Sequence, residues 1–242
     1  MSWKTSNNKK ALHWNDGEFR YTWDRPGLNM ISNLEDIRVF SKQSFQGCRG
    51  SHDWDHTLRV YNLCLHIGEA EGADLEVLKI AAYLHDVGRK VQDDSKGAVC
   101  HAEEGATIAA HVLKGYPLSA KKKGNIIRSI RSHRFRDNHE PETLEAKVLF
   151  DADKLDSIGA IGIARAFQFA GEVGARLHNS QIDLSDTMAY STEDTAYREF
   201  RLKLSKIKDR MFTAEGSRMA RKRHELMEEF FRSFLREYEG CE

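Results

Sequence analysis

Apolar residues recur at the three- and four-residue spacing of an α-helix along most of the chain after residue 30. This periodicity predicts helices that begin near residues 34 and 119, and helices over about 56–71, 75–84, 101–113, 143–170, 193–212 and 214–238. Residues 171–192 lack it and are expected to form a loop, and no segment of any length alternates as a strand would. The pattern therefore predicts one all-α domain over residues 31–242.

Residues 1–30 do not follow the helical pattern. They contain Trp3, Trp14 and Trp23, together with the turn signal DRPGLN. We expect an N-terminal extension that packs on the main domain through these aromatic side chains, and the sequence assigns no function to it.

The size and composition are those of a globular protein with one main core. The chain has 242 residues, of which 40% are hydrophobic and 31% are charged. Lys and Arg together number 37, as do Asp and Glu, so the formal net charge is zero. The basic runs at 121–136 and 218–224 are each followed by acidic residues. They are typical of solvated helix faces, so we expect no stable nucleic-acid binding.

The sequence has no feature of a membrane or secreted protein. No apolar stretch approaches the roughly 20 residues of a membrane span. The first ten residues, MSWKTSNNKK, lack the apolar core of a signal peptide, and the four cysteines show no CxxC spacing. We therefore expect a cytoplasmic protein with reduced thiols, whose exposed helix faces could support a homodimer.

A few ionisable residues stand where the apolar pattern asks for a buried side chain. His56 begins one predicted helix, and His85 and Asp86 end the next. Asp151 and Asp153 both lie on a later helix, and periodicity does not choose between them. Burying such groups is costly unless they are paired or bind a metal.

Two imidazoles and two carboxylates would offer a metal both nitrogen and oxygen donors. This set suits Mn²⁺, Fe²⁺, Zn²⁺ or Ni²⁺ and lacks the thiolates of a structural zinc site. Singly, each residue would more often be a hydrogen-bonded core residue or a helix cap. Because the four come in order from three helices, a bundle that joins those helices could hold the ion in its core.

In order, His56, His85–Asp86 and Asp153 resemble the H…HD…D signature of the HD-domain metal-dependent phosphohydrolases. The surrounding segments SHDWDHTLRV, AAYLHDVGRK and FDADKLDSIGAIGIAR resemble the family's three ligand helices. The last segment has a form typical of a bacterial and archaeal subgroup of stand-alone HD hydrolases, as do the closing helices. The resemblance covers the chain apart from its N-terminal extension. It implies an HD-domain helical bundle whose metal is held by His56, His85, Asp86 and Asp153, with Asp151 as a neighbouring or helix-anchoring group.

The resemblance also implies roles for basic residues near the ligands. Lys154 matches a position that contacts the substrate phosphate in related nucleotide hydrolases, and Arg89 stands where the family commonly has lysine. Phosphoryl transfer needs mainly positioning and positive charge. We therefore expect Lys154, Arg89 and Arg165 to bind substrate, with a solvated helix face as an equal interpretation of Arg165.

Three further residues are candidates for catalysis. His101 and His133 lie between the HD pair and the last ligand, where related families use histidines for a second metal, a general acid or a phosphate contact. We expect one tightly held ion, with both histidines lining the pocket. Asp53 lies one turn before His56, where it could orient His56, accept a proton from water or cap the helix.

The resemblance implies a metal-dependent phosphohydrolase that acts on a nucleotide. The first expectation from the subgroup is hydrolysis of a (deoxy)nucleoside triphosphate to a monophosphate and pyrophosphate with one Mn²⁺. Fe²⁺, Ni²⁺, Zn²⁺ and Mg²⁺ are the alternative metals. The alternative functions are a nucleotide phosphomonoesterase or phosphodiesterase, a di-iron oxygenase of the HD type, and a non-catalytic metal-binding regulatory module.

Overall fold

The structure is a computed structural model, which describes residues 13–15, 18–20, 31–45, 54–134, 140–180 and 183–241. The described chain is mostly helical, which confirms the predicted all-α class. Its α-helices are α1 (Leu34–Ser44), α2 (Trp54–Glu71), α3 (Leu75–Leu84), α4 (Arg89–Asp94), α5 (His101–Val112), α6 (Ala120–Ser132), α7 (Leu144–Leu155), α8 (Gly159–Glu172), α9 (Ala196–Leu202) and α10 (Ala214–Tyr238). Two 3-10 helices are η2 (Leu184–Asp186) and η3 (Leu204–Arg210). Strands β1 (His13–Asn15) and β2 (Glu18–Arg20) form an antiparallel hairpin within the predicted N-terminal extension.

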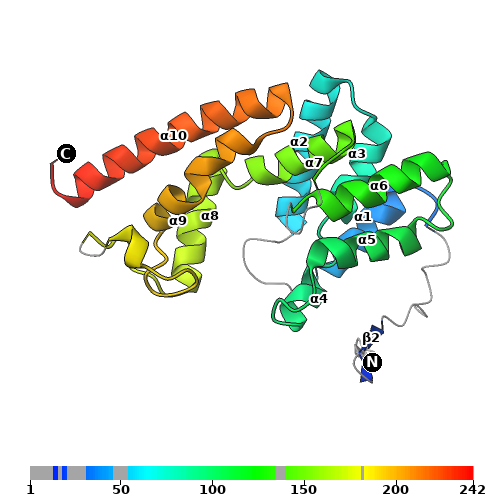
Figure 1. Ribbon diagram of the computed structural model, residues 1–242, viewed down its shortest axis with the longest axis horizontal. Helices are drawn as coiled ribbons and strands as arrows, with labels where there is room; N and C mark the ends of the chain where they lie inside the picture. Colours follow the sequence, from blue (N-terminus) through cyan, green and yellow to red (C-terminus); the bar gives the residue numbers. More distant parts are fainter. Residues whose placement is uncertain are drawn as a thin grey trace, which may run out of the picture.

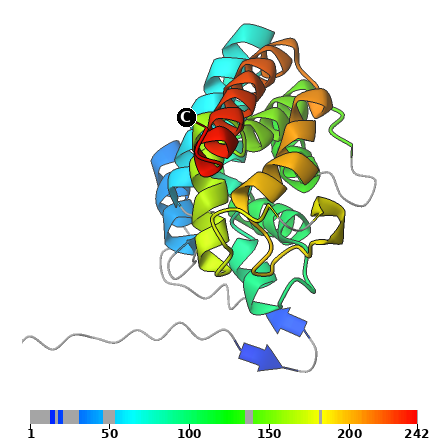
Figure 2. The same ribbon diagram turned by 90° about the vertical axis from the view of Figure 1, so that its left-hand side faces the viewer.

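The helices form a body and an adjoining group, which lie side by side in Figure 1, whereas Figure 2 views the molecule from the side of the adjoining group. Helices α1–α7 make the body, whose buried core lies where α2, α3, α6 and α7 pack on one another. Helices α8, α9 and α10 pack together beside it, and α10 also contacts α7 and α2. None of the described helices has both the length and the apolarity that crossing a membrane requires.

Side-chain caps fix where α3 and α7 begin. The Asp74 carboxylate accepts hydrogen bonds from the backbone N–H groups of Glu76 and Val77 at the start of α3. The Thr143 hydroxyl accepts from the N–H of Ala146 at the start of α7. These caps satisfy N–H groups that have no partner within the helix, so α3 and α7 begin where the sequence predicts.

The prediction of one continuous helix over 143–170 is wrong, because the chain breaks between α7 and α8. Helix α7 ends at Leu155 and α8 begins at Gly159. Gly159 has a φ of +78°, a left-handed conformation that favours glycine. A β-carbon there would also lie 2.9 Å from Cγ of Arg223 on α10. The break redirects the chain out of the body and into α8.

The prediction of one continuous helix over 193–212 is also wrong. The chain forms α9 and then the tighter 3-10 helix η3. In a 3-10 helix, side chains three residues apart lie on the same side. Leu204 and Ile207 are both buried, so the tighter winding places both in the core. The short helix α4, between Gly88 and the start of α5, was not predicted.

Asp151 anchors the start of α10 to α7. Its buried carboxylate accepts hydrogen bonds from the backbone N–H of Phe212 at 2.9 Å and of Thr213 at 2.8 Å. It also accepts from the Thr213 hydroxyl at 2.6 Å. Thr213 in turn caps α10 by accepting from the N–H of Gly216. Asp151 is therefore a helix-anchoring group, as the resemblance implied.

Replacement of Asp151 with asparagine is expected to lower the free energy of unfolding by about 2 kcal/mol. The amide NH₂ would face N–H and O–H donors, and a buried donor without an acceptor costs about 1–3 kcal/mol. Urea unfolding measures this change. Asp209→Asn, at an exposed position in η3, is the control and should change stability by less than about 0.5 kcal/mol. Equal stability of the two variants would contradict the anchoring role.

Candidate metal centre

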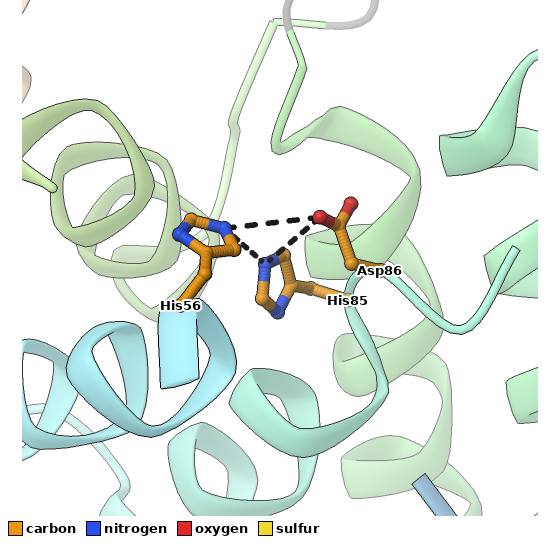
Figure 3. Close-up of side chains that lie close together, drawn as sticks. All are labelled: His56, His85 and Asp86. Atoms are coloured by element: carbon orange, nitrogen blue, oxygen red, sulfur yellow. Dashed lines mark hydrogen bonds and ion pairs between the residues drawn. The ribbon is translucent and has the colours of Figure 1, made fainter. Parts of the chain in front are cut away.

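Four imidazoles and one carboxylate meet inside the body. His56 lies in the first turn of α2, and His85 and Asp86 follow the end of α3. His101 is the first residue of α5, and His133 follows the last residue of α6. All five residues are at most 2% exposed. Figure 3 shows His56, His85 and Asp86 pointing toward one another, so residues from separate helices share one buried volume.

One set of donor atoms is formed by His56, His85 and Asp86, whose ligand atoms all lie within 4.8 Å of one another. The Nε2 atoms of His56 and His85 are 3.3 Å apart. Oδ2 of Asp86 lies 3.7 Å from His56 Nε2 and 3.8 Å from His85 Nε2. Asp153 borders this set, since its Oδ1 lies 3.4 Å from His56 Nε2. The four residues predicted as ligands therefore lie together.

A second set is formed by Asp86, His101 and His133. The Nε2 atoms of the two histidines are 3.1 Å apart. Oδ1 of Asp86 lies 3.3 Å from His101 Nε2 and 3.5 Å from His133 Nε2. The two oxygens of Asp86 thus face different sets, so this carboxylate lies between them.

The backbone fixes the tautomer of two of the histidines. Nδ1 of His85 lies 2.7 Å from the carbonyl oxygen of Ala82. Nδ1 of His133 lies 2.6 Å from the carbonyl oxygen of Ile130. A carbonyl oxygen can only accept, so each Nδ1 carries the hydrogen. In both rings Nε2 is left as the nitrogen available to a metal.

Side chains fix the other two histidines in the same way. Nδ1 of His56 lies 2.7 Å from Oδ2 of Asp156, and Nδ1 of His101 lies 2.8 Å from Oε1 of Gln92. The Gln92 atom also accepts from the Arg134 guanidinium at 2.9 Å, which identifies it as the oxygen. The Nε2 atoms of His56 and His101 are therefore also directed at the centre.

The electrostatics of the centre fit a bound cation. Burial lowers the pKa of His85 to about 4 and that of His101 to about 2, so both rings are neutral at pH 7. Burial also opposes protonation of His56, but hydrogen bonds with Asp153 and Asp156 raise its pKa to about 9. Neutral imidazole nitrogens close to carboxylate oxygens repel unless a cation lies between them. The donors present fit a divalent metal ion, which would displace the proton of His56.

Asp153 and Lys154 form the more accessible side of the centre. The Asp153 side chain is 14% exposed, and its Oδ2 accepts from the Lys154 ammonium at 2.7 Å. Burial raises the pKa of Asp153, but Lys154 and His56 more than offset it and hold this pKa well below its usual value. The ammonium also lies 5.2 Å from the centre of the Phe150 ring. Asp153 is therefore an ionised carboxylate, as a metal ligand must be.

The other predicted residues differ in whether they contact a predicted ligand. The Arg89 guanidinium donates to both oxygens of Asp86, at 3.0 and 3.1 Å. Arg165 donates at 2.6 Å to Asp156, behind His56, and has no described contact with a predicted ligand. Asp53 lies outside the described residues.

A close approach of backbones brings α5 to the HD turn, which is formed by residues 85–88 after α3. A β-carbon on Gly88 would lie 2.4 Å from the carbonyl oxygen of His101 and 2.6 Å from the backbone nitrogen of Gly105. A β-carbon on Gly105 would lie 3.1 Å from the carbonyl oxygen of His85. Glycine at these positions lets the first turn of α5 pack on the turn after α3. The glycine in HDVG therefore helps to place His101 beside Asp86.

The sequence analysis missed one buried polar residue of the centre, Asp156. It is 1% exposed and lies in the break after α7. It stands three residues after Asp153 in the segment DADKLD. Side chains three residues apart lie on one side of a helix, and this spacing could have singled it out.

An all-α fold around a buried His/Asp centre is the arrangement of the HD domain, and the comparisons with known proteins agree. The family model described as "HD domain" matches residues 53–158. The uncharacterised protein YpgQ of Bacillus subtilis is 32% identical over 220 residues, which cover 89% of this chain and 98% of YpgQ. The chain therefore belongs to the HD-domain family.

Solved structures of the family resemble this fold. YpgQ of Bacillus subtilis in complex with ADP has 31% identity and a TM-score of 0.64, covering 84% of this chain and 94% of that one. A predicted HD superfamily hydrolase from an uncultured Thermotogales bacterium has 28% identity and a TM-score of 0.63, covering 86% and 94%. A comparison of sequences also finds ribonuclease Y of Chloroflexus aurantiacus, which is 28% identical over 119 residues. These residues cover 49% of this chain and 21% of that enzyme. The chain is thus an HD-superfamily protein like YpgQ.

Titration of the metal-stripped protein with Mn²⁺ is expected to give one tight and one weaker binding event. The first donor set is bordered by Asp153 and so offers two carboxylates. The second set shares Asp86 and adds only His101 and His133. His133→Ala should therefore remove the weaker event and keep the tight one. Calorimetry and the Mn²⁺ paramagnetic resonance signal would follow both events.

The control for this titration is His111→Ala, at an exposed position on the same helix as His101. It should bind Mn²⁺ as the parent does. Two unchanged events in His133→Ala would contradict a second site built on His133.

Proposed function

We propose that the protein is a metal-dependent phosphohydrolase that cleaves a (deoxy)nucleoside triphosphate to a monophosphate and pyrophosphate. The observation that carries this proposal is the convergence of four Nε2 atoms on the carboxylate of Asp86, with cationic side chains beside it. Family membership supports hydrolysis as the reaction, and the stand-alone HD subgroup that the sequence resembles supports pyrophosphate as the product.

His56, His85, Asp86 and Asp153 would hold the tight metal ion, with Mn²⁺ the first candidate. A bound divalent ion supplies a Lewis acid for a phosphoryl oxygen and for the attacking water. The Nδ1–H bonds of the imidazoles fix the orientation of their rings, so their Nε2 atoms would be the donors to the ion. These side chains therefore enter the reaction already oriented, which lowers the cost of assembling the site.

Lys154 and Arg89 would bind the substrate's phosphates. The Lys154 side chain is 26% exposed and is bonded to Asp153, so its ammonium can reach a phosphate beside the ion. Nη2 of Arg89 bonds to Asp86, whereas its buried Nε has no partner among the described atoms. Both cations would stabilise negative charge in the transition state.

A nucleotide is the substrate class that the relatives support. YpgQ was solved in complex with ADP, and this chain covers nearly all of that protein. The residues that would select a base are not identified by the sequence. The assay therefore includes triphosphates of every base.

The test is a substrate panel with separated products. Metal-stripped protein would be incubated with Mn²⁺ and a set of nucleoside and deoxynucleoside tri- and monophosphates, with a chelator-treated sample as the control. Release of pyrophosphate from triphosphates only when Mn²⁺ is present is the expected result. Orthophosphate from monophosphates alone would identify a nucleotidase. No turnover by protein that binds metal would contradict the proposal and favour a regulatory module.

The second donor set favours two further candidates, a phosphodiesterase and a di-iron oxygenase. Because Asp86 lies between two sets of imidazoles, the centre could hold two ions, as a phosphodiesterase or a di-iron oxygenase of the HD type would. Protein purified with two irons that consumes oxygen and does not hydrolyse the panel would support the oxygenase. Hydrolysis of phosphodiesters, without oxygen uptake, would support the phosphodiesterase.

A further inference from the structure

We propose that Asp156 is a positioning residue for the metal centre, acting through His56. The inference rests on the proposed metal site and adds a residue that neither the family signature nor the donor sets contain. It follows from three contacts of one buried carboxylate, to His56, Arg59 and Arg165.

The contact with His56 orients the ring. Oδ2 of Asp156 accepts from Nδ1–H of His56 at 2.7 Å, in a pair that is almost fully buried. In Figure 3 one ring nitrogen of His56 faces His85 and Asp86, and the other points away from them. Asp156 holds the nitrogen that points away. A carboxylate in this position fixes the tautomer and makes Nε2 a better donor to a metal.

Two arginines hold the Asp156 carboxylate in place. Nε and Nη2 of Arg59 donate to its two oxygens, at 2.6 and 3.1 Å. Nη1 of Arg165 donates to Oδ2 at 2.6 Å and to the Asp156 carbonyl oxygen at 3.1 Å. Both carboxylate oxygens are thus hydrogen-bonded to an arginine, and Oδ2 also to His56. The carboxylate has little freedom to turn away from His56.

The cluster also joins three segments of the fold. Arg59 lies one turn after His56 on α2, Asp156 lies in the break after α7, and Arg165 lies on α8. The sequence did not predict the break that ends at Gly159. This break turns the chain next to Asp156. The position of His56 depends on the chain direction at this junction as well as on its own helix.

The test compares metal affinity in two variants that lose a buried carboxylate. Asp156→Ala is expected to raise the dissociation constant for Mn²⁺ by about 10–100-fold, the usual effect of removing such a partner. Asp194→Ala is the matched control, since Asp194 is also buried and binds Arg198 at 2.7 Å, away from the described donor sets. It should lose comparable stability in urea but keep the parent's Mn²⁺ affinity. Calorimetry on metal-stripped protein measures both constants.

Asp156→Asn keeps an acceptor for Nδ1–H of His56 and should bind Mn²⁺ more tightly than Asp156→Ala, though less tightly than the parent. It also serves as the test if the alanine variant fails to fold. Parent-like Mn²⁺ affinity in both Asp156 variants, or an equal loss in Asp194→Ala, would overturn the positioning role. A parent that binds no metal would overturn the centre itself. A parent that binds metal but hydrolyses no nucleotide would overturn the proposed function alone, and the affinities would still decide the role of Asp156.

Discussion

Asp86→Ala is expected to abolish tight metal binding and to lower nucleotide hydrolysis by about a thousandfold or more. Asp86 belongs to both donor sets, with Oδ2 facing His56 and His85 and Oδ1 facing His101 and His133. Its loss also leaves the Arg89 guanidinium without its described partner beside the centre. A thousandfold is about 4 kcal/mol of transition-state stabilisation, which is within the range that a metal ion supplies. Mn²⁺ titration and product release measure the two effects.

The matched control for this prediction is Asp94→Ala. Asp94 lies on α4, next to the HD turn, and forms a surface pair with Lys90 at 2.9 Å. Such a pair contributes at most about 1 kcal/mol, so its loss should leave metal affinity and turnover unchanged. Hydrolysis that persists in Asp86→Ala at saturating Mn²⁺ would show that Asp86 is not required for the reaction.

The sequence singled out His56, His85 and Asp86, but it did not predict the chain break and the hydrogen bonds around them. The helices that carry His56, His85 and Asp86 show apolar faces, and those faces pack in the body as their periodicity required. A polar residue that continues the apolar face of such a helix is expected to lie near the core, so its convergence with others could be expected. The start of α3 at Leu75 was also predicted, since the cap that fixes it involves only a few neighbouring residues.

Other features depend on contacts between distant segments and left little trace in the sequence. The break before Gly159 lies inside an apolar-periodic stretch and is stabilised by packing against α10. Asp156 forms its hydrogen bonds with His56 and Arg59, which lie about a hundred residues earlier in the chain. His101 and His133 were recognised as candidates, but their convergence on one oxygen of Asp86 required the fold.

Gly88→Ala is expected to lower the free energy of unfolding by about 3 kcal/mol and to weaken metal binding at the second donor set. The new β-carbon would lie 2.4 and 2.6 Å from backbone atoms of His101 and Gly105, and these cannot move as a flexible side chain can. Overpacking of this kind commonly costs about 1–3 kcal/mol. The start of α5 would have to shift, and His101 would move with it. Urea unfolding and Mn²⁺ titration measure the two changes.

Gly171→Ala distinguishes this close approach from a general effect of replacing glycine. Gly171 lies in α8, and a β-carbon there would meet no atom within 4 Å beyond its chain neighbours and the adjoining helix backbone. Alanine is the better helix former, so this variant should be more stable than the parent by up to about 1 kcal/mol, with unchanged metal binding. Opposite signs at the two positions would show that the glycine of the HD turn is required for close packing. A stable Gly88→Ala with two Mn²⁺ events would mean that α5 tolerates a shift, and that His101 does not depend on contact with that turn.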